Sequence, residues 1–163
     1  ARLFAITTGS CEKTLKGHLG EVRSAEFSPD GLRVVTASSD GSAKLFCVTA
    51  GICVRTLDHP CAVVAGSFSP DGTWVLTASQ NVAPRLFNAD SGRLERSFTG
   101  HLGAVHWATF SGERVITASE DGTARLYDVE GSCLQAFSGH LDTVTSATLS
   151  RDGGSLLTTS ADN

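Results

Sequence analysis

An internal repeat is the feature that most constrains this chain of 163 residues: one unit of about forty residues occurs four times. The same point in each copy is marked by a two-residue step that ends in His: Gly17-His18, Asp58-His59, Gly100-His101 and Gly139-His140. The steps lie 41, 42 and 39 residues apart, and residues 139–163 with 1–16 make up 41 more. We therefore divide one domain into repeats 17–57, 58–99, 100–138, and 139–163 joined with 1–16.

Each repeat contains four short runs separated by turn residues, which indicates an all-β fold. In the first full copy the runs are 22–27, 33–38, 43–48 and 53–57. Turns such as Ser28-Pro29-Asp30-Gly31 combine a Pro, which presets one backbone dihedral, with a Gly that accepts positive φ. Strand-length runs at this regular spacing are typical of sandwiches, barrels and propellers. No segment keeps an apolar period of 3.6 residues long enough to predict a helix.

The predicted strands are apolar or small on both faces. The run 33–38 (RVVTAS) recurs as WVLTAS at 74–79 and RVITAS at 114–119. A sheet covered on one face alternates apolar and polar residues, whereas a sheet covered on both faces does not. Each four-stranded unit is therefore expected to lie between two neighbours, and units stacked about an axis form a propeller.

The His step, the Ser-x-Asp-Gly turn and the aromatic residue that follows it resemble the WD repeat, over the whole chain. The closing Trp-Asp pair of that family is degenerate here, as Phe46-Cys47, Phe87-Asn88, Tyr127-Asp128 and Phe4-Ala5. The resemblance implies a WD40-type β-propeller of four-stranded antiparallel blades, four blades per chain. The second repeat departs furthest, because Asp58 replaces Gly, Asn81 replaces the turn Asp, and Pro84 begins a strand.

The resemblance also implies a hydrogen-bonded structural tetrad in each blade, made by the His, the turn Asp, a strand Ser or Thr, and the Trp. Positions two apart share a strand face, so either the Ser or the Thr fits. Phe has no indole N–H, so three blades should lose the last link. The residues concerned are His18, Asp40 and Ser38 (or Thr36); His101, Asp121 and Ser119 (or Thr117); His140, Asp162 and Ser160 (or Thr158).

Variable positions at the rim are the candidates for binding a partner. In related propellers, the slot held here by His106, the slot two residues earlier and the slot before the turn Asp cluster on the top face. Their variety against a uniform framework fits a tailored binding surface, although unconstrained loop ends would also vary. The candidate partner-binding residues are Glu21, Arg23, Ser39, Val64, Gln80, His106, Glu120, Thr143 and Thr145.

Composition and motifs favour a binding protein over an enzyme. With a net charge of −4 and a pI near 5.7, the chain lacks the basic footprint expected for nucleic acid or an anionic membrane. Ser, His and Asp recur together in several repeats, whereas a catalytic triad is unique. No HExxH, zinc spacing or phosphate-binding loop is present, so we expect no catalysis, cofactor or metal. The alternative is a substrate-recognition or regulatory fragment of a larger, possibly enzymatic, multidomain WD40 protein.

Five cysteines and two tryptophans carry further expectations. Cys11, Cys53 and Cys133 share a slot with Leu94, which predicts a small buried apolar position and free thiols, as in the cytoplasm. Trp107 is expected to plug the channel or hold two blades apart. Trp74, at a strand end expected to be exposed, fits an interface anchor or an aromatic packed on its own blade.

The divided repeat predicts unpaired strand edges at both ends of the chain. Two strands, within 1–6 and 11–15, lie at the N-terminus, and two, within 144–149 and 155–160, at the C-terminus. Closure within one chain would give four blades, and a homodimer would give an eight-bladed ring. The modest side chains of the outer strands favour the narrow wedges of eight blades. The remaining alternative is an excerpt of a longer propeller.

Overall fold

The structure, a computed structural model, describes residues 1–80 and 82–162, and every regular element in that part of the chain is a β-strand. Twelve strands form three antiparallel four-stranded sheets, which we call blades one, two and three. Blade one contains β3 (Val22–Phe27), β4 (Arg33–Ser38), β5 (Ser42–Cys47) and β6 (Cys53–Asp58). Blade two contains β7 (Val63–Phe68), β8 (Trp74–Ser79), β9 (Val82–Asn88) and β10 (Leu94–Ser97). Blade three contains β11 (Val105–Ser111), β12 (Arg114–Ser119), β13 (Ala124–Asp128) and β14 (Cys133–Phe137).

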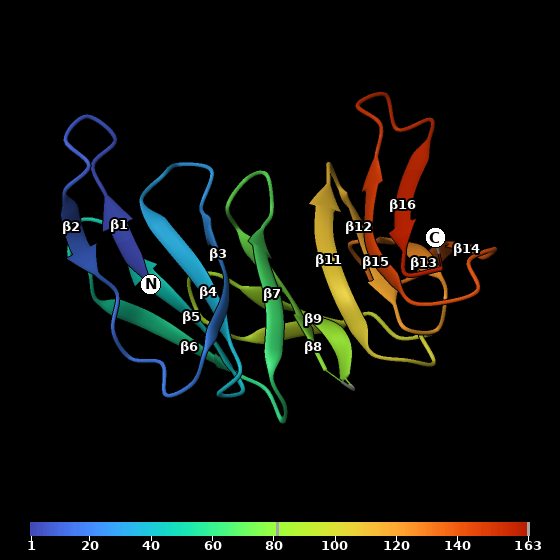
Figure 1. The fold of residues 1–163 in the computed structure, drawn as a ribbon, viewed down its shortest axis with the longest axis horizontal. Helices are drawn as coiled ribbons and strands as arrows, with labels where there is room; N and C mark the ends of the chain where they lie inside the picture. The colour runs from blue at the N-terminus through green and yellow to red at the C-terminus, as the bar shows by residue number, and fades with distance from the viewer. Residues whose placement is uncertain (81, 163) are drawn as a thin grey trace.

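The divided repeat forms two separate hairpins at the ends of an arc (Figure 1). The outer half-blade consists of β1 (Arg2–Phe4) and β2 (Cys11–Thr14), and the inner half-blade of β15 (Val144–Leu149) and β16 (Leu156–Ser160). The termini lie far apart along the arc, so the four-bladed closure within one chain that we weighed is not the form observed.

Local hydrogen bonds explain where the strands turn. In the turn between β3 and β4, Ser28 Oγ donates to Asp30 Oδ1 at 2.5 Å, and the same oxygen accepts the Leu32 N–H at 2.9 Å. Gly31 takes φ = +70° there, a conformation that costs other residues strain. Ser69 and Asp71 repeat the arrangement in blade two, so this turn chemistry fixes the length of these two hairpins.

The core lies between the blades rather than inside any one of them. The innermost strand of each unit packs on the previous one: β7 on β3 and β4, β11 on β7 and β8, and β15 on β11 and β12. The second strand of each complete blade is consequently covered on both faces, and Val35, Leu76 and Ile116 at its centre are fully buried. The prediction of sheets covered on both faces is confirmed for these three strands.

The prediction that the repeated Cys position is buried was wrong. Cys11, Cys53 and Cys133 are exposed, and Leu94 is largely exposed as well. These positions begin the outermost strand, beyond which no sheet lies, and each thiol points to the backbone carbonyl two residues later. All five cysteines are free thiols.

The two tryptophans lie in different environments. Trp74 is half-buried against the core that blades two and three share, near Leu86 and Val129, so it is neither exposed nor packed on its own blade alone. Trp107 lies on β11, the innermost strand of blade three, and remains exposed.

Candidate partner-binding face

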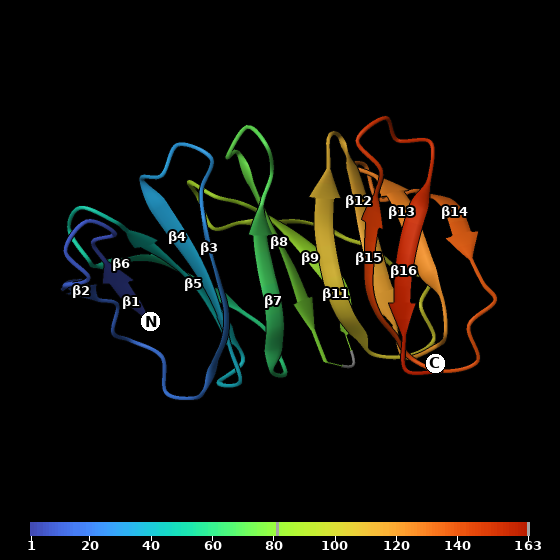
Figure 2. The ribbon, with the colours of Figure 1, turned by 45° about the horizontal axis from the view of Figure 1, so that its top comes forward.

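One side of the arc carries the loops that precede β3, β7, β11 and β15, together with the turns that follow β4, β12 and β16. We call this side, along the lower edge in Figure 2, the top face. Its loops run from the outermost strand of one unit to the innermost strand of the next. They therefore join neighbouring blades, and what holds them fixes the shape of the face.

A His holds each of these loops to the following blade. His18 Nδ1 lies 2.8 Å from Asp40 Oδ2, and its Nε2 lies 2.7 Å from Thr36 Oγ1. The same pair of bonds recurs in blade three and in the inner half-blade, with His–Asp distances of 2.8 and 3.0 Å. The residues of these two networks are His101, Asp121 and Thr117; His140, Asp162 and Thr158.

The hydroxyl that meets the His is therefore the Thr, and the Ser has a different partner. Ser38 Oγ accepts the backbone N–H of Asp40 at 3.2 Å, and so fixes the turn rather than the ring. Ser119 and Ser160 do the same for Asp121 and Asp162. The residues in the Trp position are Phe46, Phe87 and Tyr127, all buried, and Phe4, which is exposed.

Blade two lacks the Asp carboxylate of the other clamps, and a backbone carbonyl accepts the His hydrogen bond instead. His59 Nδ1–H donates to the Leu57 carbonyl at 3.0 Å, and Nε2 lies 2.8 Å from Thr77 Oγ1. Burial lowers the pKa of His59 to about 4, so the ring is neutral at pH 7.

The carboxylates of the networks are ionised. Burial alone would raise the pKa of Asp121, but hydrogen bonds from Thr123, the Leu102 N–H and His101 outweigh it and bring that pKa to about 2. The corresponding bonds at Asp40 hold its pKa still further below the usual range. Burial also lowers the pKa of His101. An ionised Asp, a His and a Thr hydroxyl, repeated in successive units, form a structural clamp rather than a reacting centre.

The clamps present three leucines to solvent. Each Asp carboxylate also accepts the N–H of the residue after the His, at 2.8 to 2.9 Å. That residue is Leu19, Leu102 or Leu141, and these side chains are 97%, 94% and 94% exposed. Their backbone is fixed while their side chains touch almost nothing, so the top face carries anchored apolar groups.

The predicted rim residues fall into pairs and isolated positions. His106 Nε2 lies 3.0 Å from Glu120 Oε1, and Arg23 lies 3.8 Å from Glu21 across an exposed surface. Ser39 Oγ accepts the Glu21 N–H at 2.9 Å.

Four other predicted rim residues are less available to a partner. Val64 is half-buried against the core, and the Gln80 carbonyl accepts the Cys61 thiol. Thr143 is half-buried, and Thr145 Oγ1 bonds to Thr159 on the same half-blade. The side chains that face solvent freely are therefore mainly those of the two pairs, Arg23 with Glu21 and His106 with Glu120.

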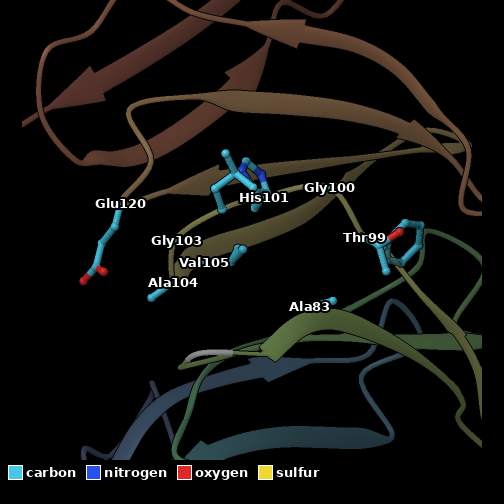
Figure 3. A pocket seen from close by; sticks show the side chains of 10 residues that line it. Ala83, Thr99, Gly100, His101, Gly103, Ala104, Val105 and Glu120 are labelled. Atoms are coloured by element: carbon cyan, nitrogen blue, oxygen red, sulfur yellow. The ribbon is translucent and has the colours of Figure 1, made fainter.

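A cavity of about 500 Å³ opens on the top face between blades two and three (Figure 3). Its lining mixes apolar residues, among them Ala83 and Ala104, with polar groups such as Thr99, and Glu120 stands at its edge. Leu102 also borders it, so one of the three anchored leucines adjoins the cavity.

Sequence reasoning missed the leucines and the cavity. The signal for the leucines was present, because Leu follows Gly-His in three of the four repeats, inside a loop where an apolar residue is unexpected. The cavity has no such signal, since it depends on how two blades meet. Among the described residues, no cluster of His, Cys, Asp and Glu could hold a metal ion, and no helix could cross a membrane.

Comparison with known proteins gives several partial relatives. Autophagy-related protein 16 of Arabidopsis thaliana is 29% identical over 99% of this chain and 33% of its own length. A guanine nucleotide-binding protein subunit beta of Nicotiana tabacum is 34% identical over 86% of this chain and 42% of its own. WD repeat-containing protein 37 of Homo sapiens is 28% identical over 90% of this chain and 39% of its own length. The chain thus spans about two fifths or less of the length of these relatives.

The family model for the WD domain, G-beta repeat, matches residues 9–47, 51–81, 92–128 and 131–163. These four matches follow the repeats of the sequence and together cover most of the chain. Proteins built from such repeats generally act as non-catalytic scaffolds for protein interactions. The four-stranded antiparallel blades, the His–Asp–Thr clamps and the four matches together place this chain in the WD40-repeat family.

Proposed function

We propose that this chain is a non-catalytic scaffold that docks a protein or peptide partner on its top face. The observation that carries the proposal is the set of three leucines, each held by a carboxylate at its backbone and almost fully exposed at its side chain. Burying a Leu side chain contributes roughly 1.5–3 kcal/mol, so covering even one of them favours binding. Because the clamps already fix the loops, little conformational freedom remains to be lost on association.

The cavity and the rim charges support a partner with apolar and basic side chains. The cavity, lined by Ala83, Ala104 and Leu102 with Glu120 at its edge, suits a partner side chain with an apolar stem and a basic end, such as Lys or Arg. Glu21, Glu120 and Asp142 are exposed on the same face, with Arg23 as the countercharge beside Glu21. Acidic groups around an apolar site favour Lys or Arg on the partner and raise its association rate.

Two matched variants test the proposal by affinity capture with quantitative mass spectrometry. Leu102→Ser removes an apolar group from the top face, whereas Leu32→Ser makes the same change at another exposed Leu, in the turn between β3 and β4 on the opposite side. We expect Leu102→Ser to lose specific proteins that wild type and Leu32→Ser both retain. A charge reversal of Arg23 and Glu120 should weaken the same set. Identical recovery with all variants would contradict the proposed face.

A second candidate is a recognition or regulatory fragment of a larger multidomain protein, possibly an enzyme. The shares of 33% to 42% that this chain covers in its relatives favour this reading. The complete reading frame distinguishes the two: an adjoining catalytic domain would support the second, and further repeats alone would support the first.

We also propose that the chain associates with a second copy into an eight-bladed ring and works in the cytoplasm. The open arc with a half-blade at each end supports the first part. Free thiols at all five cysteines, three of them exposed, suit a reducing compartment and support the second. Fluorescence microscopy of the tagged complete protein tests the compartment, and the solution mass tests the association.

A further inference from the structure

A small cavity of about 140 Å³ lies between blades two and three, beside their outermost strands. It is well below the roughly 300 Å³ of a small-molecule pocket, so it suits the end of a single side chain. Trp74 follows the turn between β7 and β8, which places the cavity on the side opposite the top face. Residues of both blades line it: Trp74, Leu86, Glu95 and Arg96 of blade two, and Val129 and Glu130 of the turn between β13 and β14.

The corresponding place between blades one and two is occupied by a guanidinium group. Arg33 begins β4 in the slot where Trp74 begins β8. The Arg33 guanidinium donates to Asp90 Oδ1 and to the Gly72 carbonyl of blade two, both at 2.9 Å. Its Cζ lies 5.5 Å from the centre of the Phe68 ring, which adds a cation–π contact. At this junction the repeat therefore places a cation of its own on an acidic and aromatic site.

The junction between blades two and three keeps the acid but has an aromatic ring in place of the cation. Glu130 and Asp90 each follow the buried aromatic residue of their blade by three positions, so the acidic position of the turn is retained. Trp74 holds the slot of Arg33 and brings an indole ring instead of a positive charge. Among residues 1–80 and 82–162, the exposed Glu130 has no ion-pair partner. An acidic and aromatic site is thus left without its internal cation.

A second carboxylate borders the same cavity. Glu95 on β10 holds the slot of Val54 on β6, and Val54 packs against the core between blades one and two. A carboxylate therefore replaces an apolar group here, and its side chain is only 29% exposed. Within the described part of the chain, its only ion-pair contact is with Arg93 Nε, at 3.9 Å on a side chain that is 79% exposed. Such a long, exposed contact contributes little, so the Glu95 carboxylate is available to a better partner.

Arg96 also borders the cavity, but it fills a different place in the repeat. It holds the slot of Arg55, whose side chain lies against Gly92 of the next blade. Arg96 lies against Gly131 in the same way, with its Cδ 3.9 Å from the position of an added Cβ. Its guanidinium donates to the backbone carbonyl of Glu95 at 3.5 Å. Arg96 thus makes a contact that is common to the repeats and does not substitute for the missing cation.

We infer that this cavity binds an arginine side chain of a protein partner, whose guanidinium takes the place that an internal arginine holds at the preceding junction. The Trp74 indole attracts a cation more strongly than other aromatic rings do, and a guanidinium suits it because it is planar. Glu95 and Glu130 accept its N–H groups in charge-assisted hydrogen bonds. Leu86 and Val129 cover the apolar stem. The site lies opposite the anchored leucines, so it does not rest on the function proposed for the top face.

Titration followed by proton–nitrogen correlation NMR tests the site, because the chain has two tryptophans and therefore two indole N–H signals. Trp107 is exposed on β11, so its signal is an internal control for non-specific contact. The probes are two capped tripeptides, alanyl-arginyl-alanine and the same peptide with citrulline, which has nearly the same shape and no charge. We expect the arginine peptide to shift the Trp74 signal alone, with a dissociation constant in the millimolar range. The citrulline peptide should bind at least about tenfold more weakly.

A matched pair of variants tests the role of the second carboxylate. Glu95→Gln removes it from the cavity, whereas Glu12→Gln makes the same change in the same repeat slot, on β2 of the outer half-blade. Both positions lie on outermost strands, so both variants should fold, which circular dichroism verifies. We expect Glu95→Gln to weaken binding of the arginine peptide roughly tenfold or more and Glu12→Gln to leave it unchanged.

Several results would overturn the inference. They are no shift of the Trp74 signal, equal shifts of both indole signals, equal binding of the citrulline peptide, or unchanged affinity in Glu95→Gln. Tighter binding of the corresponding lysine peptide would refute the choice of a guanidinium. Capture by Leu102→Ser reports on the top face alone, so failure of this site and failure of the proposed function are distinguishable.

Discussion

Replacing the clamp Thr by Val should destabilise the protein by an amount that depends on which blade is changed. Thr and Val have nearly the same shape, so the substitution removes a hydroxyl and little else. The hydroxyl bonds His Nε2 at 2.7 to 2.8 Å in blades one and three and in the inner half-blade. The substitution leaves that ring nitrogen without a partner, and water compensates only where the ring is accessible.

The exposure of the rings sets the expected order. The His18 and His101 side chains are 5% and 3% exposed, so an unpaired nitrogen there costs about 1–3 kcal/mol of unfolding free energy. His140 is 33% exposed, so water can replace the hydroxyl and the cost falls below about 1 kcal/mol. Thr36→Val and Thr117→Val should therefore lower the free energy of unfolding more than Thr158→Val does.

Urea unfolding followed by circular dichroism measures the three free energies, and the slope with urea shows whether the native state is unchanged. Thr148→Val, at an exposed position of β15, is the control for the loss of a hydroxyl alone. The series belongs at a protein concentration where light scattering gives the mass of one chain, because the association proposed above would change the surroundings of His140. Equal costs at all three clamps under that condition, or no cost at Thr36 and Thr117, would refute the reasoning.

Three further predictions concern blade two and its junction with blade one. The pKa of His59 falls from 6.5 to about 4 on folding, so stability is complete above pH 6.5 and is lost as the pH falls toward 4. After allowance for partial exposure, the loss of unfolding free energy is about 2 kcal/mol. His59→Gln should therefore flatten the dependence of the unfolding free energy on pH between pH 6.5 and 4. The same pH dependence in wild type and variant would contradict this. Gly41→Ala should lower the free energy of unfolding in urea by about 1–3 kcal/mol, which is more than Gly31→Ala lowers it. Both glycines have positive φ, but only Gly41 has a backbone oxygen 3.1 Å from the position of an added Cβ. A larger loss for Gly31→Ala would exclude this crowding. Arg33 links the two blades through Asp90 at 2.9 Å and the Gly72 carbonyl at 2.9 Å, so Arg33→Ala should lower the thermal midpoint more than Asp90→Ala, which removes a largely exposed carboxylate. Equal effects would mean that Arg33 stabilises the junction only through its ion pair with Asp90.

Turn residues in the sequence predict most of the strands, because their side-chain hydrogen bonds and backbone preferences form the turns locally. The runs 22–27 and 33–38 coincide with β3 and β4, since Pro29, Asp30 and Gly31 define the turn between them. The third run was placed at 43–48, whereas β5 begins one residue earlier because Ser42 pairs with Asp58 on β6. A boundary set by pairing with a distant strand leaves little trace in the local sequence.

The site was less predictable than the fold, because it depends on three-dimensional placement. The choice between Ser and Thr in the clamp depends on which of two residues on one strand face lies under the ring, which spacing does not decide. The position of Cys53 was misjudged because an apolar slot looks alike on an inner strand and on an outermost strand. His106 and Glu120 were both placed on the top face, but the contact between them, beside the bulge of β11 against β12, was not predicted.

The carboxylates that hold the leucines keep their negative charge over a wide range of pH. The pKa of Asp121 is about 2, and those of Asp40 and Asp162 are also lowered. At these three turns the anion persists throughout the range found in living cells, from neutral cytosol to acidic vesicles. A partner that docks on Leu19, Leu102 or Leu141 would therefore meet a backbone N–H held by an ionised carboxylate at either pH.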